Sequence, residues 1–200
     1  MEKSKINLIS NTTALALHVC SAYTQNPCGI AIDATCGNGH DTLWLSEKFD
    51  KVYAFDIQKE AIENTRKLLA EHCKENVILI NDSHCNMAEY IKADRVKNEQ
   101  CIEQSPALII FNLGYLPGKD KAITTKADET LKALKSSLEI LAKGGLLSIT
   151  MYPGHEEGRK EKEAIISWAK TLSKSSYHCV RTDMLNQPET APEILWITKK

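Results

Sequence analysis

The stretch that decides the fold is Asp33-Ala34-Thr35-Cys36-Gly37-Asn38-Gly39-His40-Asp41-Thr42. It follows a short apolar segment, 30–33, and precedes a helical pattern at 40–48. The two glycines allow a tight turn and let the backbone approach a ligand closely. A strand, a glycine-containing turn and a helix in this order predict a ligand site at the carboxyl end of a parallel strand.

Outward from this turn, short apolar runs alternate with helical patterns. The expected strands are 30–33, 52–56, 77–80, 107–111 and 146–151, followed by a pair near 177–183 and 193–198. The expected helices are 11–24, 40–48, 58–73, a short one through Met87 and Tyr90, 124–142 and 156–173, with a polar connection at 92–105. This order predicts an α/β fold with a mostly parallel sheet and an antiparallel last strand.

The length and the charge balance limit what the protein can be. The chain has 200 residues, and its 25 Lys+Arg against 26 Asp+Glu give a formal net charge of -1. We expect a single domain over 1–200, with 1–28 as an N-terminal helical segment that belongs to the fold and is not a signal peptide. The charge argues against a protein that coats nucleic acid by bulk electrostatics, although it leaves room for a local basic groove.

The sequence gives little support for a membrane protein, a disulfide-rich protein or a metal-binding protein. No apolar run approaches the roughly 18 residues that cross a bilayer, so we expect no membrane span. The 7 cysteines are scattered and form no CxxC pair, which is unlike a disulfide framework or a zinc site. We therefore expect a cytoplasmic protein with reduced thiols and no metal.

The residues after the first two strands indicate the class of cofactor. Asp56 ends the second strand, where an acidic residue accepts hydrogen bonds from ribose hydroxyls. A dinucleotide site would have a third glycine where this chain has Thr42. The acidic Asp33 suits the ammonium group of S-adenosylmethionine better than it suits phosphates. The pattern predicts S-adenosylmethionine as cofactor, held by Asp33, Thr35, Gly37, Gly39 and Asp56, although a βα turn that needs glycine for geometry alone is the alternative.

Two further strand ends carry polar or aromatic residues. After 77–80 comes Asn81-Asp82-Ser83-His84, where Ser83 or His84 could bond or shape the pocket of the adenine, while Asp82 or Ser83 could cap the next helix. After 107–111 comes Asn112-Leu113-Gly114-Tyr115-Leu116-Pro117-Gly118, which resembles the tetrapeptide that amino-group methyltransferases place beside the acceptor nitrogen. Asn112 would accept hydrogen bonds from an amine and Tyr115 would pack on the acceptor, unless this is a Gly/Pro turn with a core tyrosine.

The fifth strand is followed by Tyr152-Pro153-Gly154-His155-Glu156-Glu157-Gly158-Arg159, which could form the other wall of the acceptor site. His155 and Glu157 are candidates to orient or deprotonate an amine, while the alternative for the glutamates is a helix start. Basic residues gather at the same edge and could bind a phosphate backbone or simply lie on solvated helix faces: Lys119, Lys121, Lys126, Arg159, Lys160 and Lys162.

Four runs together, 33–42, 54–58, 112–118 and 152–158, resemble a bacterial family first labelled "putative ribosomal RNA methylases". Its better-defined members are tRNA 5-(aminomethyl)-2-thiouridine methyltransferases. The string NLGYLPG, followed by a segment rich in Lys and Thr, is the most specific part of the resemblance. The chain departs from the family at Lys119, where a second glycine is usual, and near 187–189, which affects loop detail and substrate preference.

The resemblance implies a Rossmann-like class I methyltransferase fold of seven strands and N-methylation of the aminomethyl group on the wobble uridine of tRNA. It also implies a homodimer and cofactor contacts at Asn38, Asp41, Asp56, Gln58, Ser83 and His84. The expected substrate-binding residues are Leu113, Gly114, Lys119, Lys121, Tyr152, Gly154 and Arg159. The alternatives are methylation of rRNA or a small amine, a noncatalytic nucleotide-binding module, and a nicotinamide-dependent reductase, which Thr42 disfavours.

Overall fold

The computed structural model describes residues 11–24, 29–97, 105–114 and 127–200. Seven strands form one sheet in the order β3-β2-β1-β4-β5-β7-β6. Their bounds are β1 Ile30–Asp33, β2 Lys51–Phe55, β3 Val77–Ile80, β4 Leu108–Leu113, β5 Leu146–Met151, β6 Tyr177–Thr182 and β7 Glu193–Lys199. β1 to β5 pair in parallel, and β7 is antiparallel to both β5 and β6. The α/β prediction with an antiparallel last strand is confirmed.

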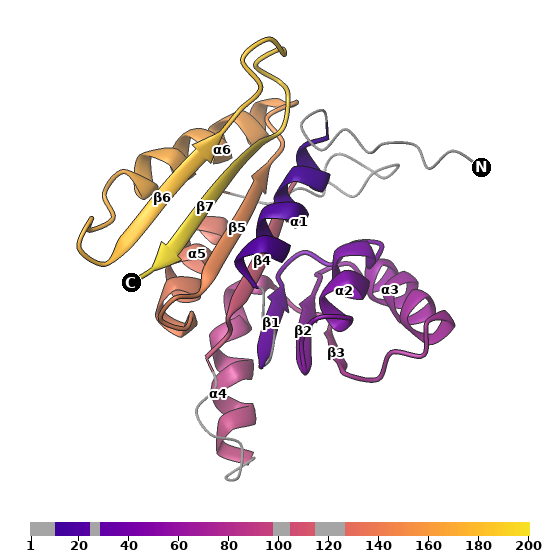
Figure 1. Ribbon diagram of the computed structural model, residues 1–200. Coiled ribbons are helices and arrows are strands. Elements are labelled where there is room, and N and C mark those ends of the chain that lie inside the picture. The colour runs from indigo at the N-terminus through magenta and orange to yellow at the C-terminus, as the bar shows by residue number, and fades with distance from the viewer. Residues whose placement is uncertain (1–10, 25–28, 98–104, 115–126) are drawn as a thin grey trace.

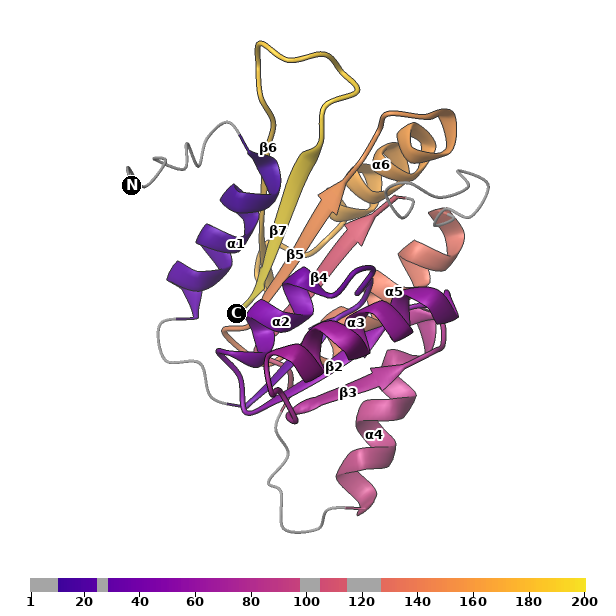
Figure 2. The ribbon, with the colours of Figure 1, turned by 90° about the vertical axis from the view of Figure 1, so that its right-hand side faces the viewer.

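Helices cover both faces of this sheet (Figures 1 and 2). In chain order they are α1 Thr12–Tyr23, α2 His40–Ser46, α3 Lys59–Glu71, the 3-10 helix η2 His84–Asn86, α4 Met87–Lys97, α5 Ala127–Ile140 and α6 Glu156–Ala169. Figure 2 shows α1 on one side of the strands and α4, α5 and α6 on the other. The strand order reverses between β1 and β4, because β2 and β3 follow on one side of β1 whereas β4 and β5 lie on its other side. Ligands are expected beside that point.

The apolar runs of the central strands explain why both faces are covered. Successive side chains of a strand point to opposite faces. On β1, Ile32 packs with α4, α5 and α6, whereas its neighbour Ala31 packs with α1 and α2. On β4, Ile109 and Ile110 divide in the same way. The sheet is therefore buried on both faces, as its continuous apolar strands predict.

Some predicted boundaries were wrong, among them the end of the helix expected over 156–173, because α6 ends at Ala169. Part of the expected connection at 92–105 is helical, because α4 continues to Lys97. Ile91 is buried, and Asp94 accepts hydrogen bonds from Lys51 Nζ and Tyr53 Oη, each at 2.5 Å, which fixes the helix to β2. The fourth strand is longer than 107–111, because residues up to Leu113 pair with β5.

Candidate functional site

A cavity of about 790 Å³ lies at the carboxyl ends of the parallel strands. Residues that follow β1, β2, β3 and β5 line it together with the end of β4. This is the edge at which open α/β sheets bind ligands, and the volume falls in the range of roughly 300–1,000 Å³ typical of small-molecule sites. The predicted location of the site is therefore where the structure has its cavity.

The turn between β1 and α2 requires its glycines. Gly37 has φ 52° and Gly39 has φ 86°, a left-handed conformation that side chains rarely adopt. A Cβ at Gly39 would lie 2.9 Å from Thr65 Cγ2 on α3. Thr65 Oγ1 also donates a hydrogen bond to Gly37 O at 3.1 Å, so α3 holds the turn against the cavity.

Asp33 lies beneath this turn and does not line the cavity. Its side chain is fully buried, and its carboxylate accepts hydrogen bonds from Thr42 Oγ1 at 2.6 Å and from Thr35 N at 3.2 Å. Burial, together with the charge of nearby Asp41, raises the pKa of Asp33 to about 7. The structure thus places Asp33 where it braces the turn, and not where the predicted contact with a ligand ammonium requires it.

Asp56 occupies the predicted position at the end of β2 and lines the cavity. Its two oxygens accept hydrogen bonds from Gly37 N at 3.0 Å and from Gln58 N at 2.9 Å. Burial raises the pKa of Asp56, and these two bonds act in the opposite direction. The carboxylate therefore ties the first two strand ends together while facing the cavity. Asn38, also in the lining, bonds to Asn64 on α3 at 3.3 Å.

After β3, Ser83 and His84 both line the cavity. Ser83 Oγ accepts a hydrogen bond from Cys85 N at 3.2 Å, so the predicted cap is present. The His84 ring lies edge-on to Phe111, with 5.5 Å between ring centroids. Burial lowers the pKa of His84, which favours the neutral imidazole. Its Nε2 is buried and, within the described part of the chain, has no hydrogen-bond partner.

Asn112 joins the cofactor turn to the end of β4. Its backbone N–H donates to Thr35 Oγ1 at 2.7 Å, and its side-chain Nδ2 donates to Asp41 Oδ2 at 2.8 Å. Burial raises the pKa of Asp41, while the Asn112 bond and the charge of His40 favour the carboxylate. Both Asn112 and Asp41 line the cavity.

The aromatic ring of Tyr152 lies near the end of β4. Tyr152 and Gly154 follow β5, and both line the cavity with Gly114. A Cβ at Gly114 would lie 3.4 Å from Tyr152 Cβ, so the small residue brings the tyrosine close to β4. Tyr152 Oη lies 3.4 Å from Thr13 Oγ1, which brings α1 to the site.

The two candidate bases are placed differently from one another. His155 lines the cavity as the N-cap of α6, and its Nδ1 accepts a hydrogen bond from Gly158 N at 3.0 Å. Since that bond uses the Nδ1 lone pair, His155 fits a helix cap better than a proton acceptor. Glu157 is mostly exposed, bonds to Lys160 at 3.0 Å and does not line the cavity. The structure therefore does not bring Glu157 to the acceptor.

Other predicted substrate residues divide into three groups. Leu113 is buried in the core, so its side chain does not face the cavity. Arg159 is exposed on α6 and lies outside the lining. The remaining ones fall outside the described residues: Tyr115, Lys119, Lys121 and Lys126.

The charge of the cavity distinguishes between cofactor classes. Among the described residues, its lining includes four carboxylates and neither lysine nor arginine: Asp41, Asp56, Asp82 and Glu129. An acidic cavity favours a cationic ligand and disfavours a pyrophosphate. A sulfonium and an ammonium group, as in S-adenosylmethionine, fit this lining.

Sequence reasoning did not assign several lining residues to the site. Ile57 directly follows Asp56, so its position was a usable signal. Thr13 on α1, Glu129 in the first turn of α5 and Thr190 before β7 come from segments that precede or follow the predicted motifs. Nothing in their local sequence indicates the cavity, because the sheet topology brings them there.

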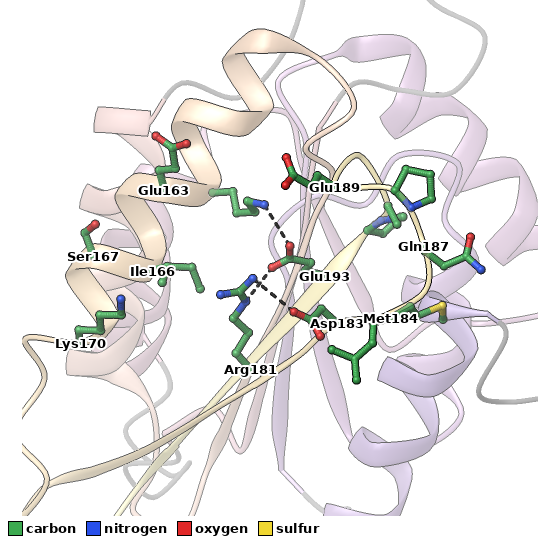
Figure 3. Close-up of a pocket in the computed structure, with 15 residues that line it drawn as sticks. Glu163, Ile166, Ser167, Lys170, Arg181, Asp183, Met184, Gln187, Glu189 and Glu193 are labelled. Carbon is green, nitrogen blue, oxygen red and sulfur yellow. Dashed lines mark hydrogen bonds and ion pairs between the residues drawn. The ribbon is translucent and has the colours of Figure 1, made fainter.

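A second cavity, of about 580 Å³, lies between α6 and the segment that connects β6 to β7 (Figure 3). Glu193 accepts hydrogen bonds from Lys162 Nζ at 3.0 Å and from Arg181 Nε at 2.8 Å, and Arg181 also contacts Asp183. The predicted basic residue Lys162 is therefore neutralised within the protein. Thr190 lines the first cavity while its neighbours line the second, so one segment separates the two.

Within the described residues, no helix is both long and apolar enough to span a membrane. The same part of the chain contains no group of three His, Cys, Asp or Glu residues that could hold a metal.

Comparison with known proteins gives the family. A family model described as "Putative rRNA methylase" matches residues 52–198. A protein of Arabidopsis thaliana named "tRNA (mnm(5)s(2)U34)-methyltransferase, chloroplastic" is 41% identical over 182 residues, which are 84% of this chain and 62% of that protein. The chain thus spans less than two thirds of this relative.

Solved structures give the same result over nearly their whole length. A "putative rRNA-methylase" from Clostridium thermocellum is 33% identical with a TM-score of 0.82, covering 92% of this chain and 97% of that one. SMU.1697c of Streptococcus mutans, a "putative methyltransferase" solved in complex with SAH, is 36% identical with a TM-score of 0.80, covering 92% and 98%. The chain therefore belongs to the family described as "Putative rRNA methylase" and has the seven-stranded class I methyltransferase fold.

Proposed function

We propose that this chain transfers a methyl group from S-adenosylmethionine to the nitrogen of the aminomethyl group on the wobble uridine of tRNA. The observation that carries the proposal is the acidic cavity, in which the amide of Asn112 lies beside the glycine turn. When bound, the cofactor supplies a methyl group on a sulfonium, so the protein needs mainly to align the acceptor and keep its amine neutral.

The cofactor residues follow from the contacts at the strand ends. Asp56 has acceptor capacity beyond its two backbone bonds and would bind the ribose hydroxyls. Ser83 and His84 would hold the adenine, His84 as a neutral imidazole. The cavity carboxylates would balance the positive charges of the cofactor. Asn38, Asp41 and Gln58 are assigned to the same site.

The acceptor would lie between Asn112 and Tyr152. The Asn112 amide oxygen can accept a hydrogen bond from the amine N–H, which orients the nitrogen lone pair. The Tyr152 ring can pack on the flat face of the base. Tyr115 stays a predicted acceptor residue, and the group that removes the amine proton is left unassigned because the contacts of His155 and Glu157 favour structural tasks.

The relative from Arabidopsis thaliana supports tRNA as the acceptor, because its name specifies the modified uridine at position 34. Exposed Arg159 on α6, with Lys119 and Lys121, would contact the phosphate backbone. Action in the cytoplasm as a homodimer and the single-domain organisation stay predictions.

The test combines purified protein, S-adenosylmethionine and tRNA that carries the unmethylated aminomethyl group. Mass spectrometry of the nucleosides should show one added methyl group on that uridine. Asn112→Ala should lower kcat by about 100-fold while the affinity for S-adenosylhomocysteine stays within threefold, because an interaction of the transition state is removed. Asp56→Ala should instead weaken cofactor binding in calorimetry. Methylation of rRNA or of a small amine in place of tRNA would overturn the acceptor assignment.

A further inference from the structure

The environment of Asn112 indicates a task for Asp41 beyond cofactor binding. The Asn112 side chain can be rotated so that either its nitrogen or its oxygen faces Asp41. An ionised carboxylate offers acceptors alone, so it accepts from Nδ2 and excludes the reverse orientation. The Nδ2 to Oδ2 distance of 2.8 Å is that of a charge-assisted hydrogen bond.

The backbone of Asn112 is fixed separately. Its N–H donates to Thr35 Oγ1 at 2.7 Å, and the residue pairs with Thr150 in the β4–β5 ladder. With the backbone and Nδ2 both held, the remaining polar atom of the side chain is Oδ1, the atom that an amine N–H would meet. Asp41 can therefore set which end of the amide is presented to the acceptor.

We propose that Asp41 is a positioning residue that acts through Asn112, holding Nδ2 so that Oδ1 is presented to the acceptor amine. This assignment rests on the proposed function for its effect on methyl transfer. The orientation of the amide itself is a property of the protein and can be measured without any substrate.

A double-mutant cycle tests whether Asp41 acts through Asn112. At saturating cofactor, Asp41→Ala should lower kcat for tRNA methylation by about tenfold to hundredfold, since a hydrogen bond to a charged group is lost. In an Asn112→Ala background the same change should alter kcat by less than about twofold. An equal loss in both backgrounds would overturn the proposal.

Conservative and matched variants separate positioning from general damage. Asp41→Asn keeps a carbonyl that can accept from Nδ2 but adds an NH₂ group that permits the reverse orientation, so it should recover only part of the activity that Asp41→Ala loses. If Asp41→Asn is as impaired as Asp41→Ala, the acceptor role is wrong. Glu47→Ala removes an exposed carboxylate at the other end of α2 and should leave kcat unchanged.

The amide orientation is read out by NMR on the cofactor-free protein. The side-chain NH₂ resonance of Asn112, assigned by its loss in Asn112→Asp, should shift in Asp41→Ala and stay in place in Glu47→Ala. An unchanged resonance in Asp41→Ala would overturn the proposal even if methyl transfer occurs. Conversely, a shifted resonance in a protein that methylates no tRNA would leave the positioning supported and refute the proposed function.

Discussion

Asp33 is a buried carboxylic acid whose ionisation opposes folding. The pKa of about 7 lies above the ordinary 3.8 because the side chain has lost its contact with water. The folded state thus favours the protonated form, and its contribution to stability is full below the unfolded pKa and is lost as pH rises through the folded pKa. Asp33 nevertheless has a structural role, because it accepts two hydrogen bonds that fix the glycine turn.

Asp33→Asn should remove this pH dependence. Between pH 5 and pH 7 the wild-type loses about 2 kcal/mol of unfolding free energy through this group, because the slope of about 1.4 kcal/mol per pH unit near pH 5 falls by half at the folded pKa. Denaturant unfolding at several pH values should show that the unfolding free energy of the variant rises relative to that of the wild-type as the pH increases. Parallel pH profiles would contradict the assignment. Glu47→Gln, at an exposed carboxylate, is the control.

For individual residues, the sequence predicted which ones lie at the strand ends but not which way their side chains point. Asp56 and Asn112 were predictable because each ends a strand whose apolar run is obvious. The sequestration of Asp33 was not, because it depends on Thr42 folding back from α2 onto the carboxylate. The cap formed by His155 likewise depends on where α6 begins.

Among the elements, the turn between β1 and α2 depends on its contact with α3. Gly39 and Gly144 both have positive φ, 86° and 74°. A Cβ at Gly39 would meet Thr65 at 2.9 Å, whereas a Cβ at Gly144 would meet nothing within 4 Å. Substitutions at these two glycines therefore distinguish the effect of backbone strain, present at both, from that of a steric clash, present only at Gly39.

Gly144→Ala should lower the free energy of unfolding by about 1 kcal/mol, through backbone strain alone. Gly39→Ala should lower it by about 2 to 3 kcal/mol and also weaken cofactor binding, because Thr65 or the turn must move. Thermal or denaturant unfolding gives the first quantity and calorimetry with S-adenosylhomocysteine the second. Equal losses of stability and an unchanged cofactor affinity would contradict the described packing.

Element types were predictable and some boundaries were not. The central strands are apolar on both faces, a pattern that covered parallel strands share. The second half of α4 has no apolar periodicity and was therefore not predicted as helix. It is held in place by the hydrogen bonds of Asp94 with Lys51 and Tyr53, and such tertiary contacts cannot be read from the local sequence.

For the whole molecule, the net charge of -1 conceals a local distribution. The cavity lining is acidic, while some of the predicted basic residues are matched within the protein. On α6, Lys160 contacts Glu156 at 2.9 Å and Glu157 at 3.0 Å, while its neighbour Arg159 is exposed. Binding of RNA should therefore involve only a few lysine or arginine contacts with phosphates.

Arg159→Ala should weaken tRNA binding about threefold or more and reduce the slope of log affinity against log salt by about one. Lys160→Ala should have a smaller effect, because its charge is already balanced. Filter binding across a salt series measures both. Equal effects of the two variants would show that Arg159 makes no particular phosphate contact.

The most direct test of the central claim is mass spectrometry of wobble uridines from cells with and without this chain. Methyl transfer to the aminomethyl nitrogen predicts that the methylated nucleoside disappears on deletion and the unmethylated amine accumulates. Wild-type protein should restore the methylated form and Asn112→Ala should not. An unchanged wobble nucleoside in the deletion would contradict the account.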